Sequence, residues 1–242
     1  AMAKFMAVLA VALFLRANQV TFGHAMFYAV GAYTVGFGVK WFGLRDMVLL
    51  VPLGALLGAA VAALIGLVMA RYREVFFAML NLAFSMMLYG VLLKLYWLTG
   101  GTDGLSAGAP TFLGYAPPRE YMRDFLYYAT LGVTGIVIYA VYRFLASPVG
   151  FYLKAMADNE IRIEYSGESV RHVMYTTYVL SGALAGVGGV LAAFTVGHIV
   201  PEYSFWIQSG DFVFVALLGG YGSVVGPLVG SIAFEFIRTY AS

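Results

Sequence analysis

Six polar residues lie inside apolar stretches of the sequence, where a polar side chain is costly unless it faces protein or water. Asn81, Ser85 and Tyr89 recur every four residues, which places them on one face of a helix. The other three are His24, Gln208 and Asp211. A transport path needs polar groups at membrane depth, so we predict that these six side chains line one.

Other interpretations of these residues stay open. Asp211 has the strongest claim to a role in transport, but the helix dipole also favours an acidic residue near a helix start. Asp211 could instead form an ion pair with Lys94 or Arg238. His24 fits a hydrogen-bonded packing residue better than a substrate ligand, and no metal-binding constellation surrounds it.

The sequence lacks the residue patterns of an enzyme. It contains no cysteine, no His-Glu-x-x-His or Gly-x-Ser-x-Gly motif and no paired aspartates in an apolar stretch. The net charge of +2 includes no basic run that would bind nucleic acid. We therefore expect a protein that is not an enzyme, holds no metal and does not bind nucleic acid.

The elements that must position these residues are membrane-spanning helices. Of the 242 residues, 62% are hydrophobic and only 11% are charged, whereas soluble domains carry about 25% charged residues. One helical crossing needs about 20 apolar residues, so we predict a single all-α domain, residues 1–242, built as a polytopic transmembrane helical bundle in a lipid bilayer. Apolar stretches run over residues 1–15, 22–39, 47–70, 75–98, 121–145, 172–196 and, interrupted by glycines, 205–237.

Two glycine patterns refine this prediction. Small residues recur at helical spacing, which lets helix backbones approach closely in lipid. The stripes are Gly54, Gly58, Ala62, Gly66 and Ala70, then Ser181, Ala185 and Gly189, then Gly222, Gly226 and Gly230. Glycines also predict a broken or re-entrant helix near Gly219–Gly222, which either lines a pathway or forms an ordinary turn between two short helices.

The distribution of cations predicts which side of the membrane each loop occupies, because Lys and Arg accumulate in short cytoplasmic loops. If every stretch crosses once, the cytoplasmic side holds Arg16, Arg71, Arg73, Arg143, Lys154, Arg162 and Arg171. The opposite side holds fewer: Lys40, Arg45, Arg119 and Arg123. The connection of about residues 147–171 decides the assignment.

This cytoplasmic connection has the pattern of a displayed helix. Pro148 and Gly150 mark the exit of the chain from the membrane. Residues 151–165 carry mixed charge and a few apolar side chains, which predicts one short amphipathic helix. The helix is either a docking element for another protein or a solvated segment on the lipid surface.

Four motifs occur in order along the chain: Thr21-Phe22-Gly23-His24-Ala25 through Tyr33, Leu-Thr-Gly-Gly-Thr-Asp-Gly-Leu at 98–105, Ser-Gly-Ala-Leu-Ala-Gly-Val-Gly-Gly at 181–189 and Leu-Gly-Gly-Tyr-Gly-Ser-Val-Val-Gly-Pro at 218–227. Together with the 147–171 connection, which is similar to a coupling loop, they resemble permeases of the branched-chain amino-acid ABC importers. The first motif is closer to the M-type (LivM-like) subunit than to the H-type subunit. The ordered set covers nearly the whole chain.

The resemblance implies a permease subunit that forms half of a translocation pathway for branched-chain or related amino acids. Its partners would be an H-type permease, two ABC ATPase subunits that hold ATP and Mg, and an extracytoplasmic substrate-binding protein. The location would be the cytoplasmic (inner) membrane of a bacterium or archaeon. This chain has no Gly-x-x-x-x-Gly-Lys-Ser/Thr loop, so we expect no cofactor in it.

The resemblance and the predicted sidedness also assign residues. Contacts with the ATPase would fall on the 147–171 connection, at Lys154, Ala155, Met156, Asp158, Asn159, Glu160, Glu164 and Gly167. Docking of the binding protein is expected on the outer side, at Thr102, Asp103, Arg119 and Glu120. The alternative for this outer loop is a tight exposed turn with no partner.

Two departures from the family pattern and one competing function complete the prediction. Arg16-Ala17-Asn18-Gln19 replaces a glycine-containing lead-in, and the chain stops soon after Glu235, which indicates a short or partial protein. A self-contained secondary transporter or channel would carry repeated broken helices, whereas only one clear break is present. The sequence leaves the substrate open among branched-chain amino acids, urea, amides and aromatic acids.

Overall fold

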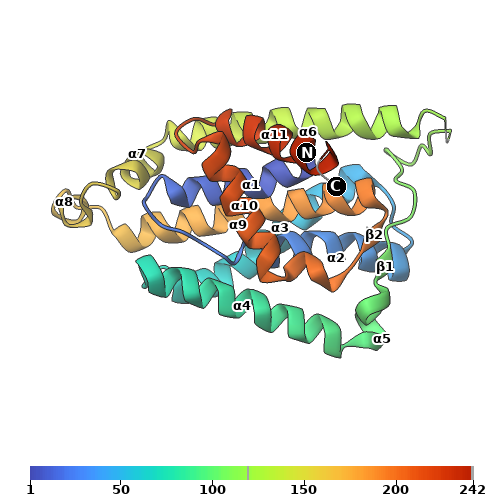
Figure 1. Cartoon of the computed structure of the whole chain (residues 1–242), viewed down its shortest axis with the longest axis horizontal. Helices are drawn as coiled ribbons and strands as arrows, with labels where there is room; N and C mark the ends of the chain where they lie inside the picture. The colour runs from blue at the N-terminus through green and yellow to red at the C-terminus, as the bar shows by residue number, and fades with distance from the viewer. Residues whose placement is uncertain (119, 241–242) are drawn as a thin grey trace.

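The computed structural model describes residues 1–118 and 120–240 and is almost entirely helical (Figure 1). This confirms the predicted all-α class. The helices are α1 (Met2–Leu15), α2 (His24–Phe42), α3 (Met47–Met69), α4 (Glu74–Lys94), α5 (Tyr96–Thr99), α6 (Met122–Leu145), α7 (Pro148–Ala155), α8 (Glu160–Tyr165), α9 (Val170–Val196), α10 (Trp206–Gly219) and α11 (Gly226–Tyr240), with the 3₁₀ turns η1 (Gly101–Asp103) and η2 (Pro201–Ser204). One small antiparallel sheet joins β1 (Leu105–Ser106) to β2 (His198–Ile199).

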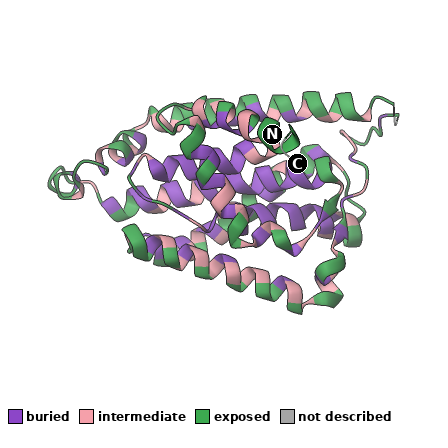
Figure 2. Cartoon of the chain, viewed as in Figure 1, coloured by how far each residue is buried: buried purple, intermediate pink, exposed green. Residues whose placement is uncertain are grey.

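Helix α9 forms the centre of the bundle, and α1, α2 and α3 pack against it (Figure 2). The 27 residues of α9 are mostly buried, and α1 is buried along most of its length. Helices α4 and α6 lie on opposite sides of this core and expose large apolar side chains such as Met79 and Ile136. Within the described residues, α3, α4, α6 and α9 are long and apolar enough to cross a membrane.

Glycines set the distance between α9 and its neighbours. A Cβ atom added to Gly58 of α3 would overlap the carbonyl oxygen of Gly182, and one on Gly186 would overlap that of Gly54. The stripe on α3 therefore packs within the subunit, as its spacing favoured. On α9, Gly189 of the predicted stripe packs closely on the Tyr28 carbonyl of α2, while Gly182 and Gly186, which lie outside that stripe, face α3.

The last apolar stretch is a helical hairpin rather than one interrupted span. Helix α10 ends at Gly219, Gly220 has φ +82°, and α11 begins at Gly226. At 1.5 Å per residue the two helices are about 21 and 23 Å long, shorter than a hydrocarbon core of about 30 Å. Backbone contacts of Gly219 with Gly226 and Gly230 hold them together. The break predicted near Gly219–Gly222 is confirmed, and it lies between two short helices.

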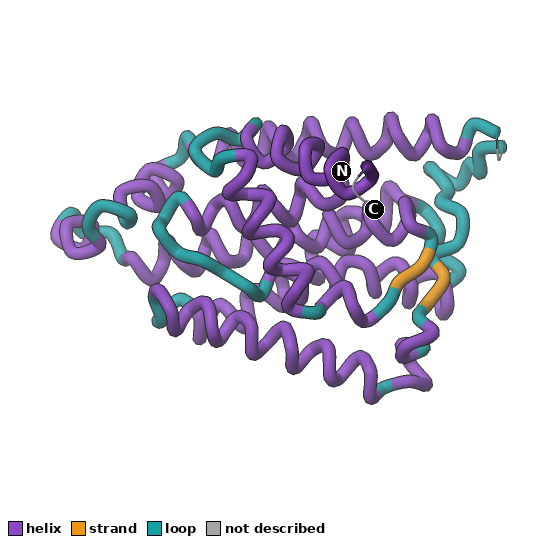
Figure 3. Tube along the Cα trace, in the orientation of Figure 1, coloured by secondary structure: helices purple, strands orange, loops and turns teal. Residues whose placement is uncertain are grey.

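The connection from α1 to α2 runs back into the bundle (Figure 3). Helix α1 ends in a Schellman motif, in which Asn18 has φ +54° and the Gln19 amide donates to the Phe14 carbonyl at 2.9 Å. The chain has no regular secondary structure from there to Gly23, which packs against Asn81 of α4. Asn81 lies seven residues into α4, or about 10 Å along its axis. Helix α2 therefore begins inside the bundle rather than at its end.

The structure groups the loops at two ends of the bundle as the distribution of cations predicted. The end of α1, the α3–α4 turn, α7 and α8 lie at one end of the bundle, and β1, β2 and α5 lie at the other (Figure 1). Arg171 donates to the Leu67 carbonyl at 3.4 Å, so the start of α9 lies beside the end of α3. We call the end with α7 and α8 the inner end and the opposite one the outer end.

The glycine contacts make a prediction about stability. In Gly58→Ala, the added methyl group would overlap the α9 backbone, and overpacking of this kind costs about 1–3 kcal/mol. The matched control is Gly132→Ala on α6, where nothing lies within 4 Å of the added Cβ and the helix gains about 0.5–1 kcal/mol. Thermal unfolding of the purified protein in detergent should show a lower midpoint for the first variant only, and equal midpoints would contradict the packing.

Candidate coupling surface and translocation residues

The inner-end connection forms two short helices instead of the single helix predicted over residues 151–165. Helix α7 begins at Pro148 after Ser147, whose hydroxyl accepts from the Gly150 amide at 3.4 Å. Helix α8 has its own N-cap, because the Asn159 side chain accepts from the amides of Ile161 and Arg162 at 2.9 and 3.3 Å. The prediction missed this boundary because the capping Asn159 interrupts an otherwise continuous amphipathic pattern.

The residues predicted to contact an ATPase divide into exposed and anchoring groups. Met156 is only 4% exposed and packs into the bundle with Leu153 and Ile163. Gly167, with φ +88°, follows the end of α8. The exposed members are Lys154, Asp158, Asn159 and Glu164, whereas Ala155 and Glu160 are partly covered.

A hollow of about 250 Å³ opens between α7 and α8. Phe151 and Ile163 contribute apolar surface to it, and Asp158 and Arg162 contribute opposite charges. Phe151 and Ile161 are respectively 74% and 62% exposed on the same segment. The inner end thus offers a concave surface with apolar and charged groups, the combination found at protein–protein contacts.

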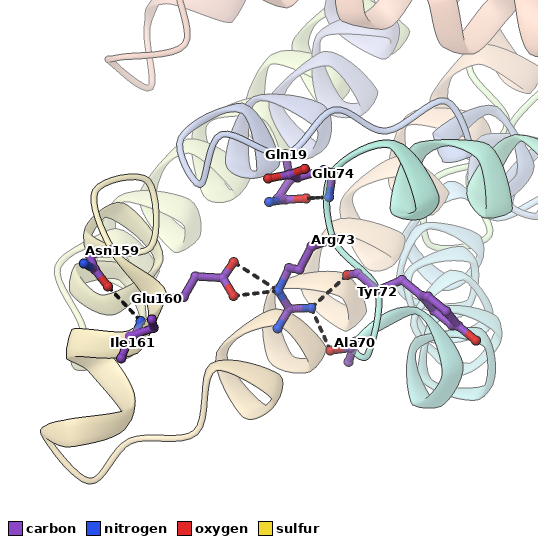
Figure 4. Close-up of polar contacts among 8 residues, drawn as sticks. All are labelled: Gln19, Ala70, Tyr72, Arg73, Glu74, Asn159, Glu160 and Ile161. Carbon is purple, nitrogen blue, oxygen red and sulfur yellow. Dashed lines mark hydrogen bonds and ion pairs between the residues drawn. The ribbon is translucent and has the colours of Figure 1, made fainter.

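An ion pair ties this segment to the rest of the bundle (Figure 4). The Arg73 Nε atom lies 3.1 Å from each carboxylate oxygen of Glu160. The Nη1 atom of Arg73 also donates to the carbonyls of Ala70 and Tyr72, each at 2.8 Å. Arg73 therefore holds the α3–α4 turn and α8 at once. Sequence reasoning placed Arg73 on the correct side but carried no signal for its partner.

A second contact at the inner end involves Gln19, which sequence reasoning treated only as a departure from the family pattern. Its Oε1 atom accepts from the Glu74 amide at 2.6 Å (Figure 4). Glu74 is the first residue of α4 and has φ +52°. The first amides of a helix have no partner within the helix, so Gln19, which is 4% exposed, caps α4 from another part of the chain.

The polar residues of α4 face the interior of the subunit. Asn81 is fully buried, donates to the Phe77 carbonyl at 2.8 Å and accepts from the Tyr178 hydroxyl of α9. Ser85 donates to the Ser204 carbonyl at 2.8 Å. The Tyr89 ring lies 5.0 Å from the ring of Phe205. The three share a face, as predicted, and that face attaches α4 to α9 and to the η2 region.

His24 is buried at the start of α2 among aromatic rings. Its Nδ1 atom lies 3.2 Å from the Thr21 hydroxyl, and the Phe14 ring centroid is 5.6 Å away. Its Nε2 atom has no hydrogen-bond partner among the described residues. The same residues contain no cluster of His, Asp and Glu that could hold a metal ion. His24 therefore packs between helices and bonds to Thr21, the interpretation its sequence context favoured.

Gln208 and Asp211 are partly exposed on α10. Between them, the Ser209 hydroxyl accepts from the Ala25 amide at 3.0 Å, which joins α10 to the start of α2. Asp211 lies in the second turn of α10 and, among the described residues, forms no ion pair with Lys94 or Arg238. The structure thus joins α10 to the start of α2 through Ser209, the residue that follows Gln208.

The outer-end motif at 98–105 is a tight structure that needs its glycines. Gly100, Gly101 and Gly104 have φ of +74°, +51° and +68°. Thr102 and Asp103 are exposed at its tip. Asp103 accepts from the Tyr96 hydroxyl, and this hydrogen bond raises the pKa of Tyr96.

The predicted outer-end residues do not all come together. Glu120 is exposed, but it precedes α6, on the side of the core opposite α4 and α5. Arg119 lies outside the described residues. The pairing of β1 with β2 fixes the end of the 98–105 turn to the end of α9.

An apolar cavity of about 480 Å³ lies among α2, α3 and α4. Its lining includes Tyr33, whose buried hydroxyl has no partner among the described residues. None of the six predicted pathway residues lines it. The cavity offers too few polar groups to hold a charged solute.

Taken together, the described residues form an all-α, multi-pass membrane protein with an exposed charged segment at one end. Residues 1–242 match the family model described as "Branched-chain amino acid transport system / permease component". The chain belongs to this family.

Three relatives illustrate the match. The high-affinity branched-chain amino acid transport system permease protein LivM of Escherichia coli (strain K12) is 28% identical over 239 residues, 89% of this chain and 56% of LivM. LivH of the same strain is 26% identical over 147 residues, 60% of this chain and 43% of LivH. The nucleoside ABC transporter permease protein NupB of Lactococcus lactis subsp. cremoris is 33% identical over 112 residues, 46% of this chain and 30% of NupB.

The LivM match covers more of the chain than the LivH match, which confirms the resemblance to the M-type subunit. The chain spans little more than half the length of LivM. No solved structure shows a significant match to it.

The buried pair of Asn81 and Tyr178 makes a prediction about stability. Tyr178→Phe removes the hydroxyl and leaves the Asn81 oxygen without its donor, which should cost about 1 kcal/mol. Tyr139→Phe on α6 is the control, because Tyr139 is 65% exposed. The free energy of unfolding, measured with denaturant in mixed micelles, should be lower for Tyr178→Phe than for Tyr139→Phe. A Tyr178→Phe protein as stable as the control would show that the bond contributes nothing.

Proposed function

We propose that the chain is the transmembrane permease subunit of an ATP-binding-cassette importer and forms half of a translocation pathway for branched-chain or related amino acids. Membership of the permease family supports this function over a self-contained transporter or channel. The structural observation that carries it is the α7–α8 segment, which presents a hollow and exposed charges at the inner end.

The proposed partners follow from the same relatives. An H-type permease would supply the other half of the pathway, because both M-type and H-type subunits are among the matches. Two ABC ATPases would bind ATP and Mg and dock on α7 and α8, and a substrate-binding protein would dock at the outer end. The complex would lie in the cytoplasmic (inner) membrane, with the cation-rich inner end in the cytoplasm.

In this mechanism, closure of the two ATPases moves α7 and α8, and the movement alternates access to the passage between the two permeases. The polar groups exposed on α10, Gln208 and Asp211, are the members of the predicted pathway set best placed to meet a solute. Asn81 and Ser85 are buried and already bonded, so their part is to hold α4 and the re-entrant connection in place.

Co-purification from the native membrane tests the function. The tagged chain should retain an H-type permease and two ATPase subunits, and ATP hydrolysis should drive uptake of leucine into liposomes that contain the complex. Asp158→Lys with Glu164→Lys reverses two exposed charges of the coupling segment without touching the Glu160 ion pair. This double variant should lower leucine uptake per ATP hydrolysed by about tenfold, the effect of disrupting a contact worth about 1.4 kcal/mol.

The matched control is Asp124→Lys, a charge reversal at the exposed outer end of α6. It should leave the coupling ratio unchanged. Normal coupled uptake by the Asp158→Lys, Glu164→Lys protein would show that α7 and α8 do not dock an ATPase, and uptake by the chain alone would favour the self-contained transporter.

The outer loop makes a separate prediction. Asp103→Asn removes the exposed charge at the tip of the 98–105 turn while keeping the size of the side chain. If the binding protein docks there, its affinity for the complex should fall, and the loss should be larger at low salt because exposed charges are screened by ions. A pull-down with the purified binding protein measures this, and unchanged docking at both salt concentrations would assign the turn a purely structural role.

A further inference from the structure

The inner end contains a set of polar contacts that leads from α8 to the connection between α1 and α2. Its members are the Glu160 carboxylate, the Arg73 side chain, the Glu74 amide and the Gln19 side chain, and we call them the inner-end relay (Figure 4). Each contact joins two different parts of the chain, and together they cross from the coupling segment to the re-entrant connection.

The first contact of the relay is the Arg73–Glu160 pair. It is one of two ion pairs among the described residues, the other joining Lys4 and Glu235. The two side chains are 23% and 35% exposed. A partly exposed pair of this kind is weak enough to open and close during a cycle. Helix α8 therefore has a reversible attachment to the α3–α4 turn.

The second step links the backbone of the α3–α4 turn to the Arg73–Glu160 ion pair. Arg73 donates to the carbonyls of Ala70 and Tyr72 while it bonds Glu160. Its guanidinium thus satisfies carbonyl groups that the end of α3 leaves without partners. A displacement of Glu160 acts on the backbone of the turn and not only on a flexible side chain.

The third step passes from the turn to the connection before α2. Gln19 is held in place by the Schellman motif that ends α1, and its side chain accepts from the Glu74 amide. Gly23, at the far end of the connection, packs directly on Asn81. The next helix, α2, begins with the Ala25 amide bonded to Ser209 of α10. The connection that follows the relay therefore leads to a contact with α10 at Ser209, next in the chain to Gln208.

We propose that Gln19 and Arg73 are positioning residues for transport, which transmit movement of the coupling segment through the inner-end relay to residues 16–23 and to α10. This inference rests on the proposed function, because the movement at α8 comes from the docked ATPases. It assigns a role to Gln19, which lies where the chain departs from the family pattern, and to Arg73, which the sequence marked only by its charge.

Spatial continuity alone does not demonstrate coupling. The test therefore measures the response of residues 16–25, which lie at the other end of the relay from α8. Hydrogen–deuterium exchange is followed for peptides covering residues 16–25 in the assembled complex, without nucleotide and after trapping with ATP and vanadate. The wild-type protein should show a difference in exchange between the two states. Glu160→Gln and Gln19→Ala should each reduce that difference about fivefold, the factor that corresponds to a weak polar contact.

Three further variants make the result specific. The double variant of Glu160→Gln and Gln19→Ala should lose no more than either single variant, because both act on one route. Gln19→Glu keeps an acceptor oxygen and should restore the response. Arg71→Ala is the matched control, since Arg71 is exposed in the same turn and its side chain makes no hydrogen bond or ion pair among the described residues.

The outcomes separate the relay from the proposed function. Failure of the wild-type chain to retain ATPases would overturn the function and the relay together. An assembled complex that responds to ATP, but in which Glu160→Gln and Gln19→Ala keep the wild-type difference in exchange, would overturn the relay alone. If Gln19→Ala does not assemble, Glu160→Gln decides the question, because the Glu160 side chain is partly exposed and its replacement removes only one weak ion pair.

Discussion

Close contact between the backbone of α9 and those of α2 and α3 is the constraint on which the rest of the structure depends. In lipid, apolar burial gives little preference for one helix pair over another, so close van der Waals packing must supply it. Gly54 and Gly58 on α3, with Gly182 and Gly186 on α9, bring these backbones together. Gly31 does the same for α2. Every other element is placed relative to this three-helix core.

The polar contacts divide into two groups with different roles. Inside the bundle, Asn81 bonds Tyr178 and Ser85 bonds the Ser204 carbonyl, so these buried polar side chains are paired within the protein. Such bonds fix α4 and the η2 region in one position, because breaking them would leave unsatisfied groups in an apolar medium. At the inner end, Arg73 and Glu160 are partly in contact with water, and their bond is correspondingly easier to break.

This division suits the proposed function, which requires a permease that is rigid in one place and movable in another. Helices α1, α2 and α9 are mostly buried and α3 packs closely on α9 through its glycines, whereas α7 and α8 are short, largely exposed and joined to this core by few contacts. The short helices α10 and α11 and the re-entrant connection before α2 are intermediate between the buried core and the exposed α7 and α8. Irregular backbone is tolerated at membrane depth where it is buried in protein or lines a cavity, and Gly23 and Gln19 are buried within the subunit.

The sequence by itself determined the class of the protein, the positions of its main helices and the family. These follow from local properties: the length of each apolar stretch, the spacing of small residues and the order of four motifs. The helix break at Gly219–Gly222 was also predictable, since glycine and proline act on the backbone where they occur. The separate helix α8 was not predicted, although its cap, Asn159, was visible in the sequence.

Only the tertiary structure decided which side chains meet. Gln19 and Glu74 are 55 positions apart in the chain, and Arg73 and Glu160 are 87 apart. No spacing rule links residues at such distances, because their contact depends on how helices that are not neighbours in sequence pack together. For the same reason the six polar residues could be placed on helix faces but not relative to one another. The inner-end relay exists because α1, α3 and α8 all pack against α9, which brings the end of α1, the α3–α4 turn and α8 to one place.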